Sequence, residues 1–258
     1  MNSQPGHDSS LATEQADCEK HGSYVRHEIK PIPGFPGIWT KCPACTDERA
    51  RMEAEHAERQ EARRKAQATQ ERLLQCGIPE RYAESTLGNY AADLPGQSRA
   101  LRTATGYVEA FPNRGASMVF CGKPGTGKTH LACAVARCIA ERGHTARFET
   151  VLSAIRSIKD TYRRDSESSE SQAIAALISP ALLVLDEVGA QLGSEHEKIL
   201  LFEIINERYQ ECRSTILISN LTIAELTTYL GDRAIDRFRE GGAVLAFDWD
   251  SHRGVRHG

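Results

Sequence analysis

Short apolar runs alternate with longer stretches of helical periodicity from about residue 77 to the end of the chain. Runs of this length that stop at glycine or polar residues are typical of buried strands. Strands are expected at residues 117–121, 145–149, 182–185, 215–218 and 243–247. Helices are expected between them, at residues 128–142, 151–164 and 195–209. This alternation predicts an α/β fold, in which a parallel sheet is flanked by helices on both faces.

The part of the chain before residue 77 lacks this alternation and divides into three segments. Residues 1–16 are polar and turn-rich, so we expect a disordered tail. Residues 17–46 hold three cysteines and several prolines and glycines, but too few apolar residues for a hydrophobic core. Residues 47–76 are dense in alanine, glutamate, arginine and glutamine, which predicts a solvated connecting helix. Residues 77–258 then form the α/β domain.

Composition narrows the class of protein further. A hydrophobic content of 40% over 258 residues is enough for a sizeable core. The net charge of −3 argues against a globally basic nucleic-acid binder, although it is compatible with a local basic patch. No stretch approaches the roughly 18 apolar residues that a membrane span needs, and the N-terminus lacks the features of a secretory signal. We therefore expect a cytoplasmic protein with no membrane contact, in which clustered cysteines indicate a metal.

A glycine-rich loop joins the first expected strand to the following helix. Its sequence, Gly122-Lys123-Pro124-Gly125-Thr126-Gly127-Lys128-Thr129, has the spacing of a phosphate-binding P-loop. Glycines let backbone N–H groups curl around phosphates, and the helix N-terminus adds its dipole. We expect this loop to bind ATP, with Lys128 reaching the β- and γ-phosphates and Thr129 holding Mg²⁺. The alternative is a chance match to a glycine-rich turn, which the strand and helix on either side make less plausible.

Polar residues at the ends of two later strands extend the nucleotide site. The run at 182–185 is followed by Asp186 and Glu187, and carboxyl ends of parallel strands are where ligands bind in such sheets. We expect Asp186 to bind Mg²⁺ through water, and Glu187 to orient or deprotonate the attacking water, which favours ATP hydrolysis. Asn220 follows the next strand and is a candidate sensor of the γ-phosphate. The alternative for Asn220 is a cap on the helix that begins near Thr222.

Four candidate metal ligands lie near the N-terminus, in two pairs. Cys18 and His21 form one pair, and Cys42 and Cys45 form the other, each with two residues in between. Three thiolates and one imidazole suit tetrahedral Zn²⁺, and metal binding would let a segment this poor in apolar residues fold. His27 is a possible substitute for His21. The alternative is a flexible tail with unpaired cysteines.

Two further groups of charged residues have both a functional and a structural interpretation. Arg233 and Arg237 lie four residues apart, on one face of an expected helix. Either can act as an arginine finger toward a neighbouring subunit's nucleotide, or simply pair with nearby aspartates. Lys159, Tyr162 and Arg163 form a basic-aromatic patch that is suited to single-stranded DNA, although a mixed-charge surface fits them equally well.

The order of these motifs resembles that of DnaC-type replicative helicase loaders, in the DnaC/IstB-like group of AAA+ ATPases. Residues 73–255 carry the resemblance, and six segments agree in order and approximate spacing. These segments are 77–90, 120–132, 159–163, 182–189, 231–237 and 247–253. The N-terminal cysteine segment is similar to that of phage and prophage members of the group.

The resemblance implies an AAA+ ATPase that binds a hexameric replicative helicase and helps to place it on single-stranded DNA. It implies that Ser194 and His196 lie near DNA together with the basic-aromatic patch, although His196 stands where an aromatic residue is often found. It also favours Arg237 over Arg233 as the trans-acting arginine, and therefore implies self-association through the ATPase domain.

Two alternative functions stay open at the level of the sequence. One is a transposition helper ATPase of the IstB type, which assembles on duplex DNA. The other is a zinc-stabilised adaptor that binds nucleotide with little turnover. Zinc ligands in the N-terminal segment and the Trp249-Asp250-Ser251 ending favour the helicase loader.

Overall fold

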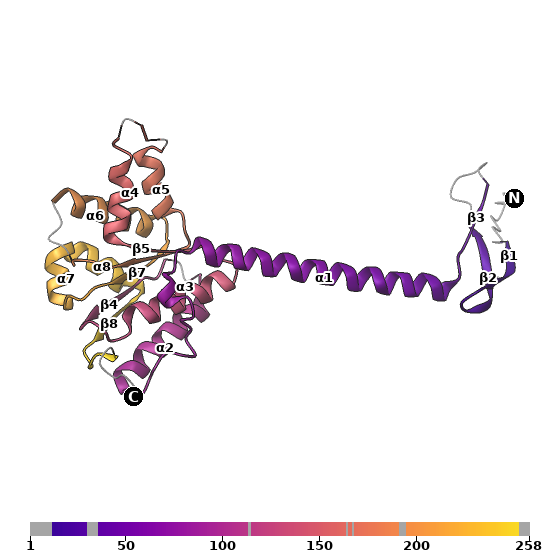
Figure 1. The fold of residues 1–258 in the computed structure, drawn as a ribbon, viewed down its shortest axis with the longest axis horizontal. Coiled ribbons are helices and arrows are strands. Elements are labelled where there is room, and N and C mark those ends of the chain that lie inside the picture. The colour runs from indigo at the N-terminus through magenta and orange to yellow at the C-terminus, as the bar shows by residue number, and fades with distance from the viewer. Residues whose placement is uncertain are drawn as a thin grey trace, which may run out of the picture. The chain divides into compact units, whose positions relative to one another are not determined.

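A computed structural model describes residues 12–29, 36–112, 115–163, 165–166, 168–190 and 195–252. The chain divides into two compact units, Met1–Ala66 and Gln67–Gly258, whose elements are shown in Figure 1. Helix α1 (Pro43–Gln75) runs through the boundary between them. The predicted α/β domain, small N-terminal module and long helix are confirmed.

The first unit contains a three-stranded antiparallel sheet that the sequence pattern did not predict. Its strands are β1 (Thr13–Cys18), β2 (Gly22–Ile29) and β3 (Ile38–Trp39), in the order β1-β2-β3. Residues 13–16 therefore belong to a strand, which corrects the expected boundary of the disordered tail, while residues 1–11 lie outside the described residues. The strand is stabilised by backbone pairing with β2 along its whole length, for which polar side chains suffice.

Helix α1 begins four residues earlier than the expected start at residue 47. Pro43 occupies its first position, where the missing N–H and the fixed φ of proline suit a helix start. Within the second unit, the end of α1 is held by a hydrogen bond from Arg72 Nε to the Ala140 carbonyl at 3.0 Å. Cys76 directly follows and is fully buried, so this end of the helix belongs to the α/β domain.

The second unit is built on a five-stranded parallel sheet in the order β5-β6-β7-β4-β8. The strands are β4 (Met118–Gly122), β5 (Ala146–Thr150), β6 (Leu182–Asp186), β7 (Ser214–Ile218) and β8 (Ala243–Phe247). Side chains on the strands alternate between two hydrophobic cores, so that Val119 belongs to one core and Phe120 to the other. Both faces of the sheet are therefore buried, as the continuous apolar runs predict.

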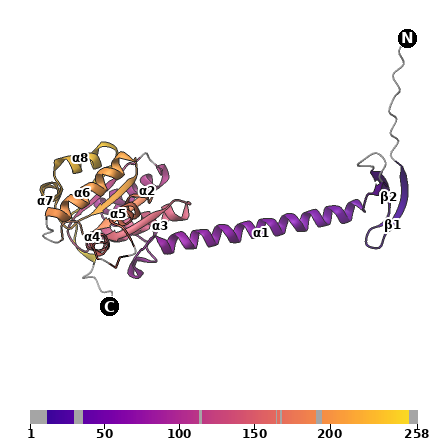
Figure 2. The ribbon, with the colours of Figure 1, turned by 90° about the horizontal axis from the view of Figure 1, so that it is seen from above.

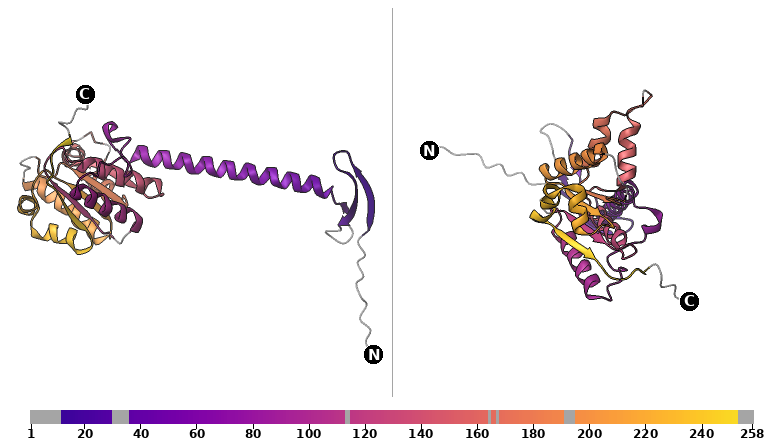
Figure 3. Two further views of the ribbon diagram at one scale, coloured as in Figure 1. Left: turned by 90° about the horizontal axis from the view of Figure 1, so that it is seen from below. Right: turned by 90° about the vertical axis from the view of Figure 1, so that its left-hand side faces the viewer.

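Helices cover both faces of this sheet (Figure 2). On one face pack α2 (Pro95–Ala110) and α3 (Lys128–Glu141), which also carries the P-loop on its N-terminus. The other face is covered by α4 (Val151–Asp160), α5 (Glu170–Ile178), α6 (Glu195–Gln210), α7 (Ile223–Leu230) and α8 (Asp232–Gly241). Helices α4 and α5 stand side by side (Figure 3, right).

Several helix boundaries differ from those that the periodicity of the sequence predicts. Helix α4 ends at Asp160 rather than 164, and Thr161 caps it. Helix α5 starts at Glu170, where no helix was expected, because Ser169 and Gln172 form a capping box at its N-terminus. A capping pair of serine and glutamine can thus begin a helix before the apolar pattern resumes.

Candidate functional site

The P-loop leaves the sheet between two neighbouring strand ends. Gly122 ends β4 with φ of 117°, and a Cβ at this position would lie 2.5 Å from the Phe247 carbonyl oxygen of β8. The backbone N–H of Lys123 donates to that same oxygen at 2.9 Å. A glycine is required here by both the positive φ and the close approach of β8.

The second half of the loop forms the N-terminus of α3. Gly127 precedes the helix with φ of 92°, and Lys128 is its first residue. The Lys128 side chain is buried, and its Nζ donates to the carbonyl oxygens of Gly122 and Lys123 at 2.8 and 2.6 Å. The ammonium group therefore lies over the loop, beside the positive end of the helix dipole, where a phosphate would bind.

An acidic pair faces the P-loop from the end of β6. Asp186 is buried, and its Oδ2 accepts a hydrogen bond from Thr129 Oγ1 at 2.9 Å. Burial raises the pKa of Asp186, while the bond from Thr129 partly opposes that rise. A buried carboxyl beside a hydroxyl gains from a cation, so the two oxygens match the donor set of a Mg²⁺ site. Glu187 follows with φ of 63°, is exposed, and turns the chain out of the strand.

Most of the predicted nucleotide-binding residues line one cleft of about 670 Å³. They come from the P-loop, β6 and β7, and are Pro124, Gly125, Gly127, Lys128, Thr129, Asp186, Glu187 and Asn220. Gly122 lies beneath the loop, and Thr126 is buried with its Oγ1 bonded to the Lys123 carbonyl at 2.8 Å. Asn220 does not cap α7, because Thr222 does so through a bond from the backbone N–H of Glu225. The strand ends thus place Asn220 and Glu187 around the same space.

The remaining wall of the cleft comes from residues whose role we did not predict from the sequence. Most of them lie in the segment that leads into the α/β domain, and one each lies on α3 and near the C-terminal end of the domain. They are Pro79, Arg81, Tyr82, Asn89, Tyr90, Ala91, His130 and His252. Much of this lead-in is irregular, apart from a short 3₁₀ turn, η1 (Glu80–Tyr82), so periodicity gives no signal there.

The C-terminal segment forms hydrogen bonds with the backbone of the P-loop. Trp249 is buried, and its Nε1 donates to the carbonyl oxygen of Thr126 at 3.0 Å. The backbone N–H of His252 donates to the Gly125 carbonyl at 2.9 Å. The Trp249-Asp250-Ser251 ending, which carried part of the family resemblance, therefore has a structural role at the nucleotide loop.

The two arginines of α8 differ in their surroundings, and neither lines the cleft. Arg233 is exposed. Arg237 is half-buried against two rings of α6, with its Cζ 5.3 Å from the centroid of Phe202 and 5.2 Å from that of Tyr209. The guanidinium of Arg237 thus makes cation–π contacts within its own chain.

The basic-aromatic patch is largely neutralised by carboxylates. Lys159 Nζ bonds to Glu197 at 2.7 Å, and the Tyr162 hydroxyl donates to Glu170 at 2.7 Å. Arg163 is exposed and lies 3.9 Å from Asp165. His196 is also exposed, on the first turn of α6. Ser194, which belongs to the same expected surface, lies outside the described residues.

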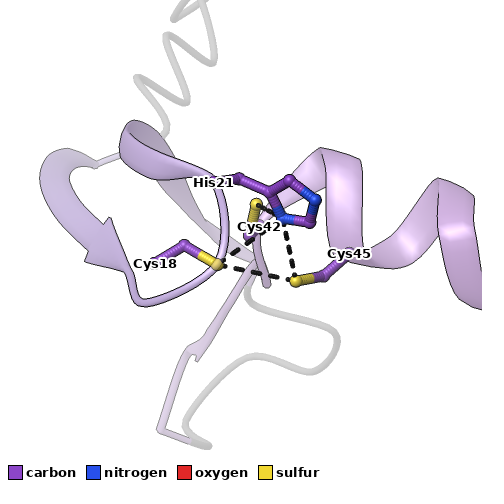
Figure 4. Close-up of side chains that lie close together, drawn as sticks. All are labelled: Cys18, His21, Cys42 and Cys45. Carbon is purple, nitrogen blue, oxygen red and sulfur yellow. Dashed lines mark hydrogen bonds between the residues drawn. The ribbon is translucent and has the colours of Figure 1, made fainter.

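In the first unit, the four expected metal ligands converge (Figure 4). Their ligand atoms all lie within 4.8 Å of one another. The His21 Nδ1 is 3.7 Å from Cys18 Sγ and 3.3 Å from Cys45 Sγ. The same nitrogen is 3.7 Å from Cys42 Sγ, and the Cys18 and Cys45 sulfurs are 3.5 Å apart. Tetrahedral zinc separates its ligand atoms by roughly 3.6–3.8 Å, so these distances fit such an ion.

Glu48 adds an outer contact to this cluster. Its Oε1 lies 3.1 Å from His21 Nε2, which leaves Nδ1 free to face the sulfurs. Hydrogen bonds from backbone N–H groups, mainly that of Lys20, lower the pKa of the Cys18 thiol to about 6. The hydrogen bond with Cys18 raises the pKa of the Cys45 thiol to about 11. One thiolate of the cluster is thus stabilised by the protein itself, and a thiolate is the form in which cysteine binds a metal.

A P-loop on an inner strand of a parallel sheet, with an acidic pair facing it at the same edge, defines a P-loop ATP-binding domain. The chain belongs to the family of IstB-like ATP binding proteins, whose sequence pattern matches residues 50–253. None of the helices in the described parts of the chain combines the length and the apolar character that crossing a bilayer requires.

Comparison with known proteins confirms the resemblance to DnaC-type loaders. The chain is 37% identical over 194 residues to the Replicative helicase loader DnaC of Escherichia coli strain K12, across 75% of this chain and 79% of that protein. It is 36% identical over 211 residues to the loader of the same name from Buchnera aphidicola subsp. Acyrthosiphon pisum, across 81% and 85%. A crystal structure of the DnaC helicase loader superposes with a TM-score of 0.60 at 27% identity, covering 66% of this chain and 100% of that one. The chain is therefore a homologue of DnaC.

Proposed function

We propose that this protein is an ATP-dependent loader that binds a hexameric replicative DNA helicase and helps to deposit it on single-stranded DNA when replication starts. The observation that carries this proposal is the 37% identity to a replicative helicase loader over most of both chains. The cleft supports it, because its P-loop, acidic pair and Asn220 surround one space of a size that suits a nucleotide.

The proposal assigns a role to each side chain of the ATP cleft. Lys128 and the loop N–H groups bind the phosphates of ATP, and Thr129 with Asp186 holds Mg²⁺, which when bound shields the phosphate charge. Glu187 accepts a proton from the attacking water, and Asn220 orients that water or the γ-phosphate. A Glu187→Gln variant keeps the shape of the carboxylate but not its basicity, so it should bind ATP without hydrolysing it.

We propose that an arginine of α8 completes this site in a neighbouring subunit. Both Arg237 and Arg233 lie away from their own chain's cleft, as a trans-acting residue requires. Arg237 is favoured by its place in the family motif, and Arg233 by its exposure. ATPase measurements on mixtures of Arg237→Ala and Lys128→Ala subunits should recover activity only if the two sites lie in different chains.

Zinc binding by Cys18, His21, Cys42 and Cys45 is the second part of the proposal. It is supported by the ligand distances and by Glu48 behind His21.

Contact with single-stranded DNA through Lys159, Tyr162, Arg163 and His196 is the third part of the proposal, and Ser194 is included from its place in the sequence. Lys159 and Tyr162 are bonded to Glu197 and Glu170, and these bonds would have to break for the two side chains to contact DNA.

A transposition helper is the second candidate, because the matching family is described as IstB-like. The two functions differ in partner and in DNA substrate. The affinity-tagged full-length chain should retain a hexameric replicative helicase in the presence of ATP. The Lys128→Ala variant should fail to retain it. Tight ATP-dependent coating of duplex DNA, with no helicase retained, would instead support the transposition helper.

A further inference from the structure

The hydroxyl group of Tyr90 is buried in the wall of the nucleotide cleft. The residue is 8% exposed, and its hydroxyl oxygen has no hydrogen-bond partner among the residues that the structure describes. A buried polar group without a partner is costly to the folded state, so such a group in a ligand cleft points to a partner on the ligand. Nothing in the proposed mechanism uses this hydroxyl.

The position of the Tyr90 ring shows which part of a ligand its hydroxyl would meet. The ring lies against Gly127, the residue before the first turn of α3. A Cβ built on Gly127 would be 3.0 Å from Tyr90 Cε2 and 3.5 Å from the hydroxyl oxygen. The hydroxyl therefore lies beside the helix N-terminus, where the P-loop binds phosphate.

The loop that carries Tyr90 is held in place by its own hydrogen bonds. Asn89 accepts from the backbone N–H of Thr86 at 2.8 Å and donates from its own N–H to the Thr86 hydroxyl at 3.1 Å. From α3, His130 lies 2.9 Å from Asn89 Oδ1, and its ring meets that of Tyr90 edge-on, with centroids 5.7 Å apart. Tyr90 is thus held beside the P-loop before a ligand binds.

The chemical state of the hydroxyl makes it a hydrogen-bond donor. Burial raises the pKa of Tyr90 to about 12, so the phenol is neutral at physiological pH. A neutral phenol can donate to an anionic oxygen. Tyr107 has a buried hydroxyl as well, but it does not line the cleft, so it serves as a comparison.

We propose that the Tyr90 hydroxyl donates a hydrogen bond to the α- or β-phosphate of the bound nucleotide. This rests on the proposed role of the cleft in binding ATP and adds a residue to it. Because the contact lies on the part that ATP and ADP share, Tyr90 contributes to the affinity for both nucleotides and does not discriminate between them.

The test compares Tyr90→Phe, Tyr107→Phe and Lys128→Ala variants of the full-length chain, with fluorescent ATP and ADP analogues as probes. Tyr90→Phe removes one oxygen and keeps the ring against Gly127. We expect it to weaken the binding of both nucleotides by about tenfold, while the melting temperature without nucleotide stays the same or rises. Tyr107→Phe should bind both nucleotides like the unmodified chain.

Three outcomes would overturn the proposal. Unchanged affinity of Tyr90→Phe, with binding lost in Lys128→Ala, would reject the role of Tyr90 and leave the nucleotide site intact. A loss confined to ATP would place the hydroxyl at the γ-phosphate instead. If the unmodified chain binds neither nucleotide, the proposed function of the cleft fails, and the role of Tyr90 fails with it.

Discussion

Removal of the proposed zinc ion should unfold the N-terminal sheet while leaving the nucleotide site intact. In residues 12–29 and 36–66, the described part of the first unit, Cys42 is the only buried residue. Full burial of one small apolar side chain contributes at most about 1–2 kcal/mol. A structural zinc site contributes about 10–16 kcal/mol of apparent binding free energy near neutral pH. The metal is therefore expected to be the main source of stability for this sheet.

The perturbation is a Cys42→Ser variant, and the matched control is Cys212→Ser, which alters an exposed cysteine outside the cluster. Atomic spectroscopy should find about one zinc per chain in the control and far less in Cys42→Ser. Hydrogen exchange followed by mass spectrometry should show that amides bonded between β1 and β2, such as those of Ala16 and Tyr24, lose their protection only in Cys42→Ser.

Nucleotide binding provides the internal check on this prediction. The described residues that line the cleft all lie between Pro79 and His252, so the affinity for ATP should be the same in both variants. Protected β1–β2 amides in a metal-free chain would refute the reasoning, because another source of stability would then hold the sheet. Equal zinc content in the two variants would refute the ligand assignment itself.

Three further predictions concern the second unit. Burial raises the pKa of Asp186, so the nucleotide-free fold loses stability as the pH rises through the pKa of this carboxyl in the unfolded chain and then through its pKa in the folded chain. At pH 7, Asp186→Asn should therefore have a higher melting temperature but bind Mg²⁺-ATP more weakly. A lower melting temperature would contradict this prediction. Trp249→Phe removes the bond to the Thr126 carbonyl and should weaken ATP binding about fivefold by calorimetry, whereas unchanged affinity would show that the C-terminal segment does not support the loop. Replacement of Lys159 and Tyr162 by alanine should weaken binding of an oligothymidine by about tenfold in fluorescence anisotropy, and unchanged binding would exclude this surface.

The sheet and the main parts of the nucleotide site were predictable because they are encoded in short contiguous segments. The inner strands β4, β6 and β7 are buried on both faces, as the full burial of Val119 and Phe120 shows for β4, so an apolar run is enough to identify them. The P-loop needs glycines where the backbone takes positive φ, as at Gly127, and those glycines are visible in the sequence.

The features that the sequence did not predict depend on contacts between distant segments. The β1–β2 pair is stabilised by backbone hydrogen bonds, so its strands show no apolar alternation. The wall of the cleft around Tyr90 is irregular, and its proximity to Gly127 follows only from the folded chain. Carboxylate partners such as Glu197 for Lys159, 38 positions away, are equally invisible to local patterns.

The most direct test of the proposed function is a loading assay with purified components. The full-length chain, ATP, a hexameric replicative helicase from the same cell and a circular single-stranded DNA are mixed, and the helicase bound to the DNA is quantified after gel filtration. We expect the chain to increase the amount of DNA-bound helicase in the presence of ATP, and Lys128→Ala to abolish the increase. No association with the helicase, together with ATP-dependent coating of duplex DNA, would show that the protein is not a helicase loader.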